Sequence, residues 1–271
     1  MAMELTLLDE RRRGRYLAQT ANYTYHLHST STDIVGLRTR LQGIGLTLDV
    51  QIDNPFYDIP SGHHSYLAFA PDHVVIAIRG SGEADDWRNN LRCGQQPYKF
   101  GGHVHSGFAL ASCGITQAVQ TELRQRPDLY DGKSLWLTGH SSGGSVAILV
   151  AQELAAAQID VAGIYTFGAP KVGDAHYARR YPLRDRLHAF ITLGDFVPLL
   201  PPHWLMCTGG RFRIQRFKHV IRPTVLIGKT LSIRAALTYL TNKQATYLER
   251  AVGASIEFSP HSLAAYIANL K

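Results

Sequence analysis

Residues 134–152, SLWLTGHSSGGSVAILVAQ, carry the clearest structural signal in the chain. Ser134–Thr138 predicts a short buried strand, and the apolar run Ser142–Gln158 predicts a buried helix. Between them stands Gly139-His140-Ser141-Ser142-Gly143, a G-x-S-x-G pattern in a strand–turn–helix setting. Glycines allow close packing there, and the helix N-terminus offers N–H groups to a developing oxyanion. The pattern indicates a nucleophilic Ser141, with a tight turn without chemistry as the alternative.

The rest of the chain alternates between strand and helix patterns from about residue 46 onward, which predicts an α/β fold. Its central sheet is expected to be mostly parallel and flanked by helices. We expect one domain over residues 1–271, with an irregular region at 206–255. The first forty residues and Ser106–Gln125 have helical periodicity. Further strands are expected at Leu46–Ile52, Ser65–Ala70, His73–Arg79, Asp160–Phe167 and Leu187–Thr192.

Composition limits the classes of protein. The 271 residues are 45% hydrophobic and 18% charged, enough to bury a core without disulfides or metal. The net charge of +7 permits attraction to anionic lipid, but no nucleic-acid-binding module is present, so no nucleic-acid partner is expected. The cysteines Cys93, Cys113 and Cys207 are an odd set, which leaves at least one free thiol and favours a reducing compartment or a bacterial origin.

Targeting and cofactor signals are weak. No run of eighteen apolar residues occurs, and Met1–Arg15 lacks the apolar centre of a signal peptide. We therefore expect a cytoplasmic protein or export by a signal-independent route. The pairs His26/His28 and His103/His105 lack a third ligand at a suitable spacing, so neither a metal nor a cofactor is expected.

The turn around Ser141 and four further segments resemble the class 3, fungal-type lipases of the α/β-hydrolase superfamily. Beside TGHSSGGSVAILVA, the matching segments follow the family's order over about residues 65–205: HVVIAIRGSGEADDWRNNL (73–91), HVHSGFALA (103–111), YTFGAPKVGD (165–174) and ITLGDFVPLLPP (191–202). The last dozen residues resemble the family as well. One departure is Ser142, where the family usually has Leu. The backbone N–H at that position is unaffected.

A serine nucleophile needs a base, and the base needs an acid to orient it. In α/β-hydrolases they follow in the order Ser, acid, His. Asp195, after a predicted strand, fits the acid and matches the family motif; its rival Asp174 suits a helix cap better. His261, in a loop before the final helix, resembles the family's terminal histidine and is chosen over the other downstream candidates, His176, His188, His203 and His219.

The resemblance also implies an oxyanion hole and a lid. The backbone N–H groups of Ser81 and Ser142 would form the hole. Residues 82–92 would be a lid with Trp87 on its apolar face, or else a short packed helix. Val225–Tyr247 is a second lid candidate with loose helical spacing, more typical of a core helix. Apolar residues of the loop 197–206 are expected to contact substrate: Val197, Leu199 and Leu200.

These signals together predict a carboxylic ester hydrolase acting on lipids, first among them triacylglycerols, by a Ser-His-Asp acyl-enzyme mechanism. A phospholipase A1 or acyltransferase would use the same residues. A lipid-binding module without turnover is the alternative from another class. The basic stretch Arg211, Arg213, Arg216, Lys218 and Arg222 fits a solvated strand face or peripheral contact with an anionic lipid surface.

Overall fold

The computed structural model describes residues 4–26, 31–52, 65–80, 94–201, 205–206, 214–226 and 261–270. Its described strands form a seven-stranded sheet in the order β1-β2-β3-β6-β7-β8-β11. The first three strands pair antiparallel, and the rest, from β3 onward, are parallel. The strands are β1 (Thr47–Ile52), β2 (Ser65–Phe69), β3 (His73–Ile78), β6 (Ser134–His140), β7 (Gly163–Phe167), β8 (Leu187–Thr192) and β11 (Thr224–Leu226).

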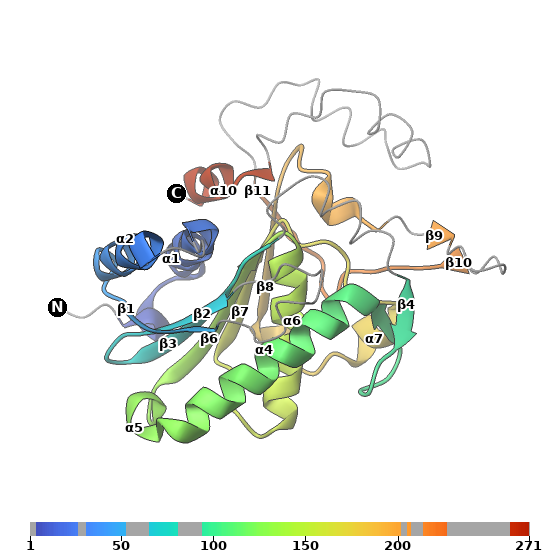
Figure 1. Ribbon diagram of the computed structural model, residues 1–271. Helices are drawn as coiled ribbons and strands as arrows, with labels where there is room; N and C mark the ends of the chain where they lie inside the picture. The colour runs from blue at the N-terminus through green and yellow to red at the C-terminus, as the bar shows by residue number, and fades with distance from the viewer. Residues whose placement is uncertain are drawn as a thin grey trace.

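Helices cover both faces of this sheet (Figure 1). One face carries α1 (Glu10–Tyr23), α2 (Ser31–Gln42) and α10 (Leu263–Asn269). The other carries α4 (Ser106–Gln125), α5 (Pro127–Tyr130), α6 (Ser142–Ala156) and α7 (Ala175–Arg180). Short 3-10 helices are η1 (Leu5–Leu7), η2 (Thr24–His26), η3 (Arg184–Arg186) and η4 (Val197–Leu199), and two small hairpins pair β4 (Gln95–Pro97) with β5 (His103–His105) and β9 (Leu205–Met206) with β10 (Ile214–Gln215).

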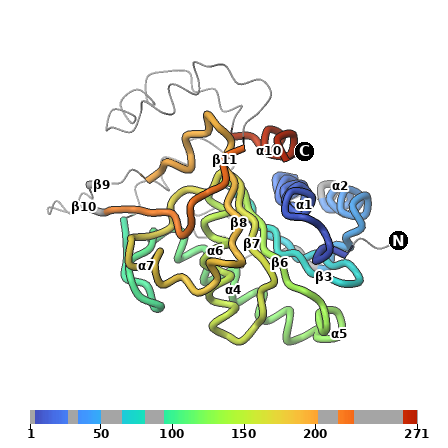
Figure 2. Tube along the Cα trace, turned by 180° about the vertical axis from the view of Figure 1, so that it is seen from behind, coloured from blue at the N-terminus to red at the C-terminus, as the bar shows by residue number. Residues whose placement is uncertain are grey.

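The two faces hold separate apolar cores. The larger core lies between the sheet and α4, α6 and α7, and it includes both faces of α6 because residues 142–154 of that helix are all buried. The second core lies under α1, α2 and α10, where Leu17, Phe167 and Tyr266 are buried. In Figure 2, seen from behind, α10 lies beside α1, so the two ends of the described chain pack on the same face.

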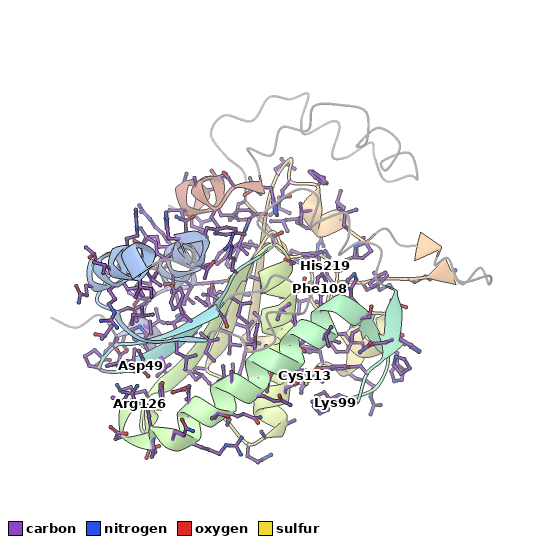
Figure 3. All side chains as sticks on the ribbon, viewed as in Figure 1. Asp49, Lys99, Phe108, Cys113, Arg126 and His219 are labelled. Carbon is purple, nitrogen blue, oxygen red and sulfur yellow. The ribbon has the colours of Figure 1, made fainter. Side chains whose placement is uncertain are left out.

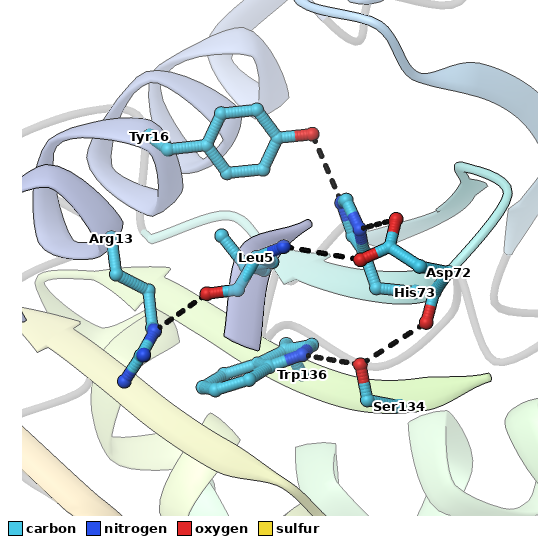
Figure 4. A network of polar contacts seen from close by, with 7 residues as sticks. All are labelled: Leu5, Arg13, Tyr16, Asp72, His73, Ser134 and Trp136. Carbon is cyan, nitrogen blue, oxygen red and sulfur yellow. Dashed lines mark hydrogen bonds and ion pairs between the residues drawn. The ribbon is translucent and has the colours of Figure 1, made fainter. Parts of the chain in front are cut away.

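A polar network fastens the N-terminal segment to the beginning of β3 (Figure 4). Asp72 accepts from the backbone N–H of Leu5 at 3.1 Å and from His73 Nδ1 at 2.8 Å. Tyr16 Oη, from α1, lies 3.1 Å from His73 Nε2. The guanidinium of Arg13 lies 5.0 Å from the ring centroid of Trp136. The hydrogen bonds give the buried polar atoms of Tyr16 and His73 their partners.

The sheet edge at β1 is tied to the far end of α4 (Figure 3). Asp49 accepts from the Arg126 guanidinium and, at 2.5 Å, from the Tyr130 hydroxyl. Cys113 lies on α4 as an exposed free cysteine. Cys93 and Cys207 lie outside the described residues.

The expected α/β fold is confirmed, and the predicted helix 106–125 and strand 187–192 have the predicted bounds. One expectation is wrong. The segment from Val225 was considered as the start of an amphipathic helix, but Val225 and Leu226 belong to β11, which pairs with β8. Residues 227–247, the remainder of that segment, lie outside the described residues. No described helix is both long and apolar enough to cross a membrane.

Candidate active site

Ser141 lies at a sharp turn between the end of β6 and the start of α6. Its backbone has φ 55° and ψ −136°, a conformation that is strained for a residue with a side chain. The Ser141 N–H donates to the carbonyl of Phe167 at 2.9 Å, which anchors the turn to β7. The first N–H groups of α6 place positive potential behind the serine.

Glycines make this turn possible because the strand and helix approach each other closely. A Cβ on Gly139 would lie 2.5 Å from the backbone of Gly143, and a Cβ on Gly143 would lie 2.4 Å from the carbonyl oxygen of Ile78. Both positions therefore exclude any side chain, as the sequence pattern predicted. The same contacts place the end of β3 against the start of α6.

Asp195 and His261 meet although 66 residues separate them. His261 Nδ1 lies 2.7 Å from Asp195 Oδ2, and the Asp195 side chain has no exposed surface, while that of His261 is 12% exposed. Because a carboxylate only accepts, Nδ1 carries the proton in the neutral ring and Nε2 presents its lone pair. Asp195 follows β8, and Ser141 follows β6, so both lie at the carboxyl end of the parallel strands.

Asp195 has two further donors. The Val197 N–H donates to Oδ1 at 2.9 Å, and the Tyr266 hydroxyl donates to Oδ2 at 2.5 Å. Burial and the neighbouring carboxylate raise the pKa of Tyr266 well above its usual value, so its hydroxyl stays protonated and remains a donor. Three donors thus hold the Asp195 carboxylate: Val197 in η4, Tyr266 in α10, and His261.

Lys171 holds the loop that follows Asp195. Its Nζ donates to the carbonyls of Leu199 and Pro201, and its backbone N–H donates to the carbonyl of Leu200 at 2.7 Å. Burial lowers the pKa of Lys171 to about 8. The Nε2 of His219 lies 2.7 Å from the carbonyl oxygen of Pro198, in the same loop. The loop that follows Asp195 is therefore held through its backbone carbonyls, in addition to the hydrogen bonds of the Asp195 side chain.

His140, directly before Ser141, contacts the backbone of His261. The Nε2 of His140 lies 2.6 Å from the His261 carbonyl oxygen, and the two rings have centroids 4.5 Å apart. On its other side, His140 Nδ1 lies 2.7 Å from Tyr25 Oη. Burial, reinforced by the nearby His261, lowers the pKa of His140 well below its usual value.

The expected oxyanion turn begins beside the serine. A Cβ on Gly80 would lie 2.9 Å from Ser141 Cβ and 2.7 Å from the carbonyl oxygen of His140, so the end of β3 reaches Ser141. Ser142 is buried at the first position of α6. Ser81, Trp87 and the whole lid candidate 82–92 lie outside the described residues, as does His203.

The proposed substrate-contacting residues have different surroundings. Val197 and Leu200 are buried, and Val197 supports Asp195 through its N–H. Leu199 is half-buried and lines a groove of about 470 Å³, together with Lys171 and with His219, which Figure 3 labels. Basic residues on its rim are Arg184, Lys218 and Arg222.

The rival residues have other roles. Asp174 caps α7, accepting from the Tyr177 N–H at 2.7 Å as expected for a helix cap. His188 Nδ1 lies 3.0 Å from Glu10 Oε1, away from Asp195. His176 lies in α7, where its Nε2 is 3.6 Å from the position that a Cβ on Gly101 would take. Among the described residues, no group of three or more His, Cys, Asp or Glu is arranged to hold a metal ion.

Sequence reasoning missed Tyr25, His140 and Tyr266 as parts of this site. His140 lies inside the G-x-S-x-G motif, so its position next to the nucleophile was a usable signal. Tyr266 follows His261 by five residues in the final helix. Tyr25 comes from η2, and nothing in the sequence near it indicates a contact with residue 140.

Known proteins resemble the part of the chain that contains Ser141 and Asp195. Residues 75–204 match the family described as lipase (class 3). The secreted mono- and diacylglycerol lipase 1 of Fusarium solani is 31% identical over 151 residues, which are 52% of this chain and 44% of that protein. Toxin TseL of Vibrio cholerae is 28% identical over 158 residues, which are 57% of this chain and 24% of the toxin. The chain thus spans less than half the length of these relatives.

A solved lipase structure resembles a larger part of the chain than the family match covers. A nonglycosylated lipase of Yarrowia lipolytica superposes with a TM-score of 0.64 at 19% identity, covering 81% of this chain and 81% of its own. At that identity the likeness shows the fold, and it extends on both sides of the matched segment 75–204. Residues 75–204 thus match the class 3 lipase family, and the chain has the α/β-hydrolase fold.

Proposed function

We propose that this protein hydrolyses carboxylic esters of lipids, with Ser141 as nucleophile, His261 as general base and acid, and Asp195 as the residue that orients His261. One observation carries the proposal: a strained serine at a strand–helix turn directly follows His140, and His140 contacts the backbone of a histidine whose Nδ1 is bound to a buried carboxylate. Such an arrangement activates a hydroxyl that is otherwise a poor nucleophile.

The reaction proceeds in two halves. Ser141 Oγ attacks the ester carbonyl carbon while His261 Nε2 accepts the hydroxyl proton, and the backbone N–H groups of Ser81 and Ser142 donate to the resulting oxyanion. The carbon–oxygen bond to the alcohol then breaks, and the alcohol leaves with the proton from His261. Water, deprotonated by the same imidazole, cleaves the acyl-serine ester and releases the fatty acid.

We propose acylglycerols as the substrate class, with triacylglycerols first. The family match and the printed name of the Fusarium solani relative, a secreted mono- and diacylglycerol lipase, support this choice. The basic rim of the groove beside Leu199 and the net charge of +7 support peripheral contact with a lipid surface. The secreted relative supports export of this protein too.

The test compares the wild type with Ser141→Ala on p-nitrophenyl butyrate, emulsified trioleoylglycerol and phosphatidylcholine. Removal of the nucleophile is expected to lower kcat by about 10⁴-fold or more. The wild type should release fatty acid from trioleoylglycerol faster than from phosphatidylcholine. Full activity of Ser141→Ala would refute the mechanism, and faster release from phosphatidylcholine would replace the substrate class while leaving the mechanism intact.

A further inference from the structure

His140 has a defined tautomer because of its two partners. The carbonyl of His261 can only accept, so His140 Nε2 carries the proton across their 2.6 Å contact. The unprotonated Nδ1 then accepts from the Tyr25 hydroxyl at 2.7 Å. Both nitrogens of a buried imidazole are thereby satisfied, and the ring is held in one orientation.

Tyr25 connects this imidazole to the end of β3. A backbone hydrogen bond joins Gly80 to the Tyr25 hydroxyl, and the Arg79 guanidinium lies 5.5 Å from the centroid of the Tyr25 ring. A Cβ on Gly80 would lie 2.9 Å from both Tyr25 Oη and Ser141 Cβ. Tyr25 comes from η2, outside the segment 75–204 that matches the family.

The histidine at 261 needs such support. Asp195 fixes its ring through Nδ1, but this bond does not hold the backbone that carries the ring. His261 lies just before α10, at the beginning of the last described segment. Proton transfer requires the imidazole to be held within about 0.5 Å of the productive geometry. The bond from His140 Nε2 supplies a backbone anchor directly beside the serine.

We propose that Tyr25 and His140 form a positioning pair, which holds the Arg79–Gly80 turn, the Ser141 turn and the backbone of His261 in one arrangement. This inference rests on the function proposed above. The pair does not touch the reacting atoms; it acts through His261 and through the turn that precedes Ser81. The N-terminal segment thereby becomes part of the active site.

The test measures kcat and KM for p-nitrophenyl butyrate separately in variants of the full chain. His140→Ala removes the anchor and is expected to lower kcat by about 100-fold, the cost of roughly 1 Å of misplacement. The KM should stay within about twofold of wild type, because the acyl site is unchanged. His140→Gln, whose amide can donate where Nε2 does, should recover part of this loss. Tyr25→Phe leaves His140 Nδ1 without its donor and the ring held on one side only, and it should lower kcat by about tenfold.

The chain contains a matched control at the other end of the sheet. Tyr16 and His73 are also joined through a hydroxyl and an imidazole nitrogen, with ring centroids 5.7 Å apart, the same as for Tyr25 and His140. Tyr16→Phe removes a comparable bond that touches no residue of the site. It should lower the melting temperature about as much as Tyr25→Phe does and leave kcat at the wild-type value.

The outcomes separate the inference from the proposed function. A kcat of Tyr25→Phe equal to that of Tyr16→Phe would overturn the inference, and so would a His140→Gln variant as slow as His140→Ala. If His140→Ala does not fold, the two tyrosine variants decide the question. Retained activity in Ser141→Ala would instead overturn the proposed function itself.

Discussion

Asp72, His73 and Tyr16 repeat, at one end of the sheet, the residue types that Asp195, His261 and Tyr266 bring together at the other. At the beginning of β3, His73 is 1% exposed and has both nitrogens engaged: Nδ1 by Asp72 at 2.8 Å and Nε2 by Tyr16 at 3.1 Å (Figure 4). The imidazole there is a brace between the sheet and α1.

At the carboxyl end of the strands the tyrosine is used differently. Tyr266 donates to the acid, 2.5 Å from Asp195 Oδ2, so the acid rather than the imidazole takes the hydroxyl. The His261 side chain is 12% exposed and adjoins the turn of Ser141 through His140. The comparison teaches that an Asp–His pair does not by itself identify a base. The two pairs differ in their surroundings. In the Asp72–His73 pair, Tyr16 occupies Nε2 of the imidazole, whereas the Asp195–His261 pair adjoins the turn of the strained Ser141.

The largest difference in kcat is expected between variants of the two aspartates, Asp195 and Asp72. Asp195→Asn disturbs the tautomer and the charge that stabilises imidazolium, and it should lower kcat by about 10⁴-fold. Asp72→Asn weakens a bond to a buried imidazole and should lower the free energy of unfolding by about 1–3 kcal/mol while kcat is unchanged. Steady-state kinetics and urea denaturation of both variants measure this contrast. An equal loss of kcat in the two variants would break it.

A smaller effect is expected from Tyr266. Tyr266→Phe removes one of three donors from a buried carboxylate, and kcat should fall about tenfold because Asp195 loses its orientation without losing His261. The melting temperature should fall as well, since the carboxylate oxygen loses a partner. Unchanged kcat in Tyr266→Phe, with a lower melting temperature, would mean that the hydroxyl only stabilises the fold.

The smallest effect concerns acid stability. Burial lowers the pKa of His73, against a smaller opposing effect of Asp72, and burial lowers the pKa of His140 further. Between these lowered values and the unfolded value of about 6.5, the unfolded chain binds more protons, so stability falls as the pH falls below about 6.5. In His73→Gln this slope should decrease by up to about 1.4 kcal/mol per pH unit.

Denaturation curves at pH 7.5, 6.5 and 5.5 for wild type and His73→Gln give that slope. Stability that depends on pH to the same extent in both proteins would show that His73 does not bury a neutral imidazole. His73 could then no longer serve as the structural histidine in the comparison with His261.

Local pattern was sufficient for much of the fold. Hydrophobic periodicity over 106–125 and the apolar strand 187–192 defined elements whose bounds agree with the structure, because burial of one stripe or one run dominates there. The cap at Asp174 was also predictable from residue type. The hairpin of β4 and β5 was not, since strands of three residues carry no periodic signal.

The candidate site was predictable where a motif names its residues and not where distant segments meet. Ser141, Asp195 and His261 follow from motif and chain order. Tyr25 reaches His140 across 115 residues, and Tyr266 reaches Asp195 across 71, so neither contact leaves a local trace. Strand β11 was missed for a related reason: Val225 and Leu226 become a strand only through pairing with β8.

The most direct test of the central claim is the rate at which a fluorophosphonate reacts with the protein, with the modified residue located by mass spectrometry. In the wild type and in His73→Gln the label should be on Ser141, at equal rates. In His261→Gln the rate should fall by about 10³-fold or more, because no base takes the hydroxyl proton. Equal labelling in His261→Gln, or a label on another residue, would contradict the account.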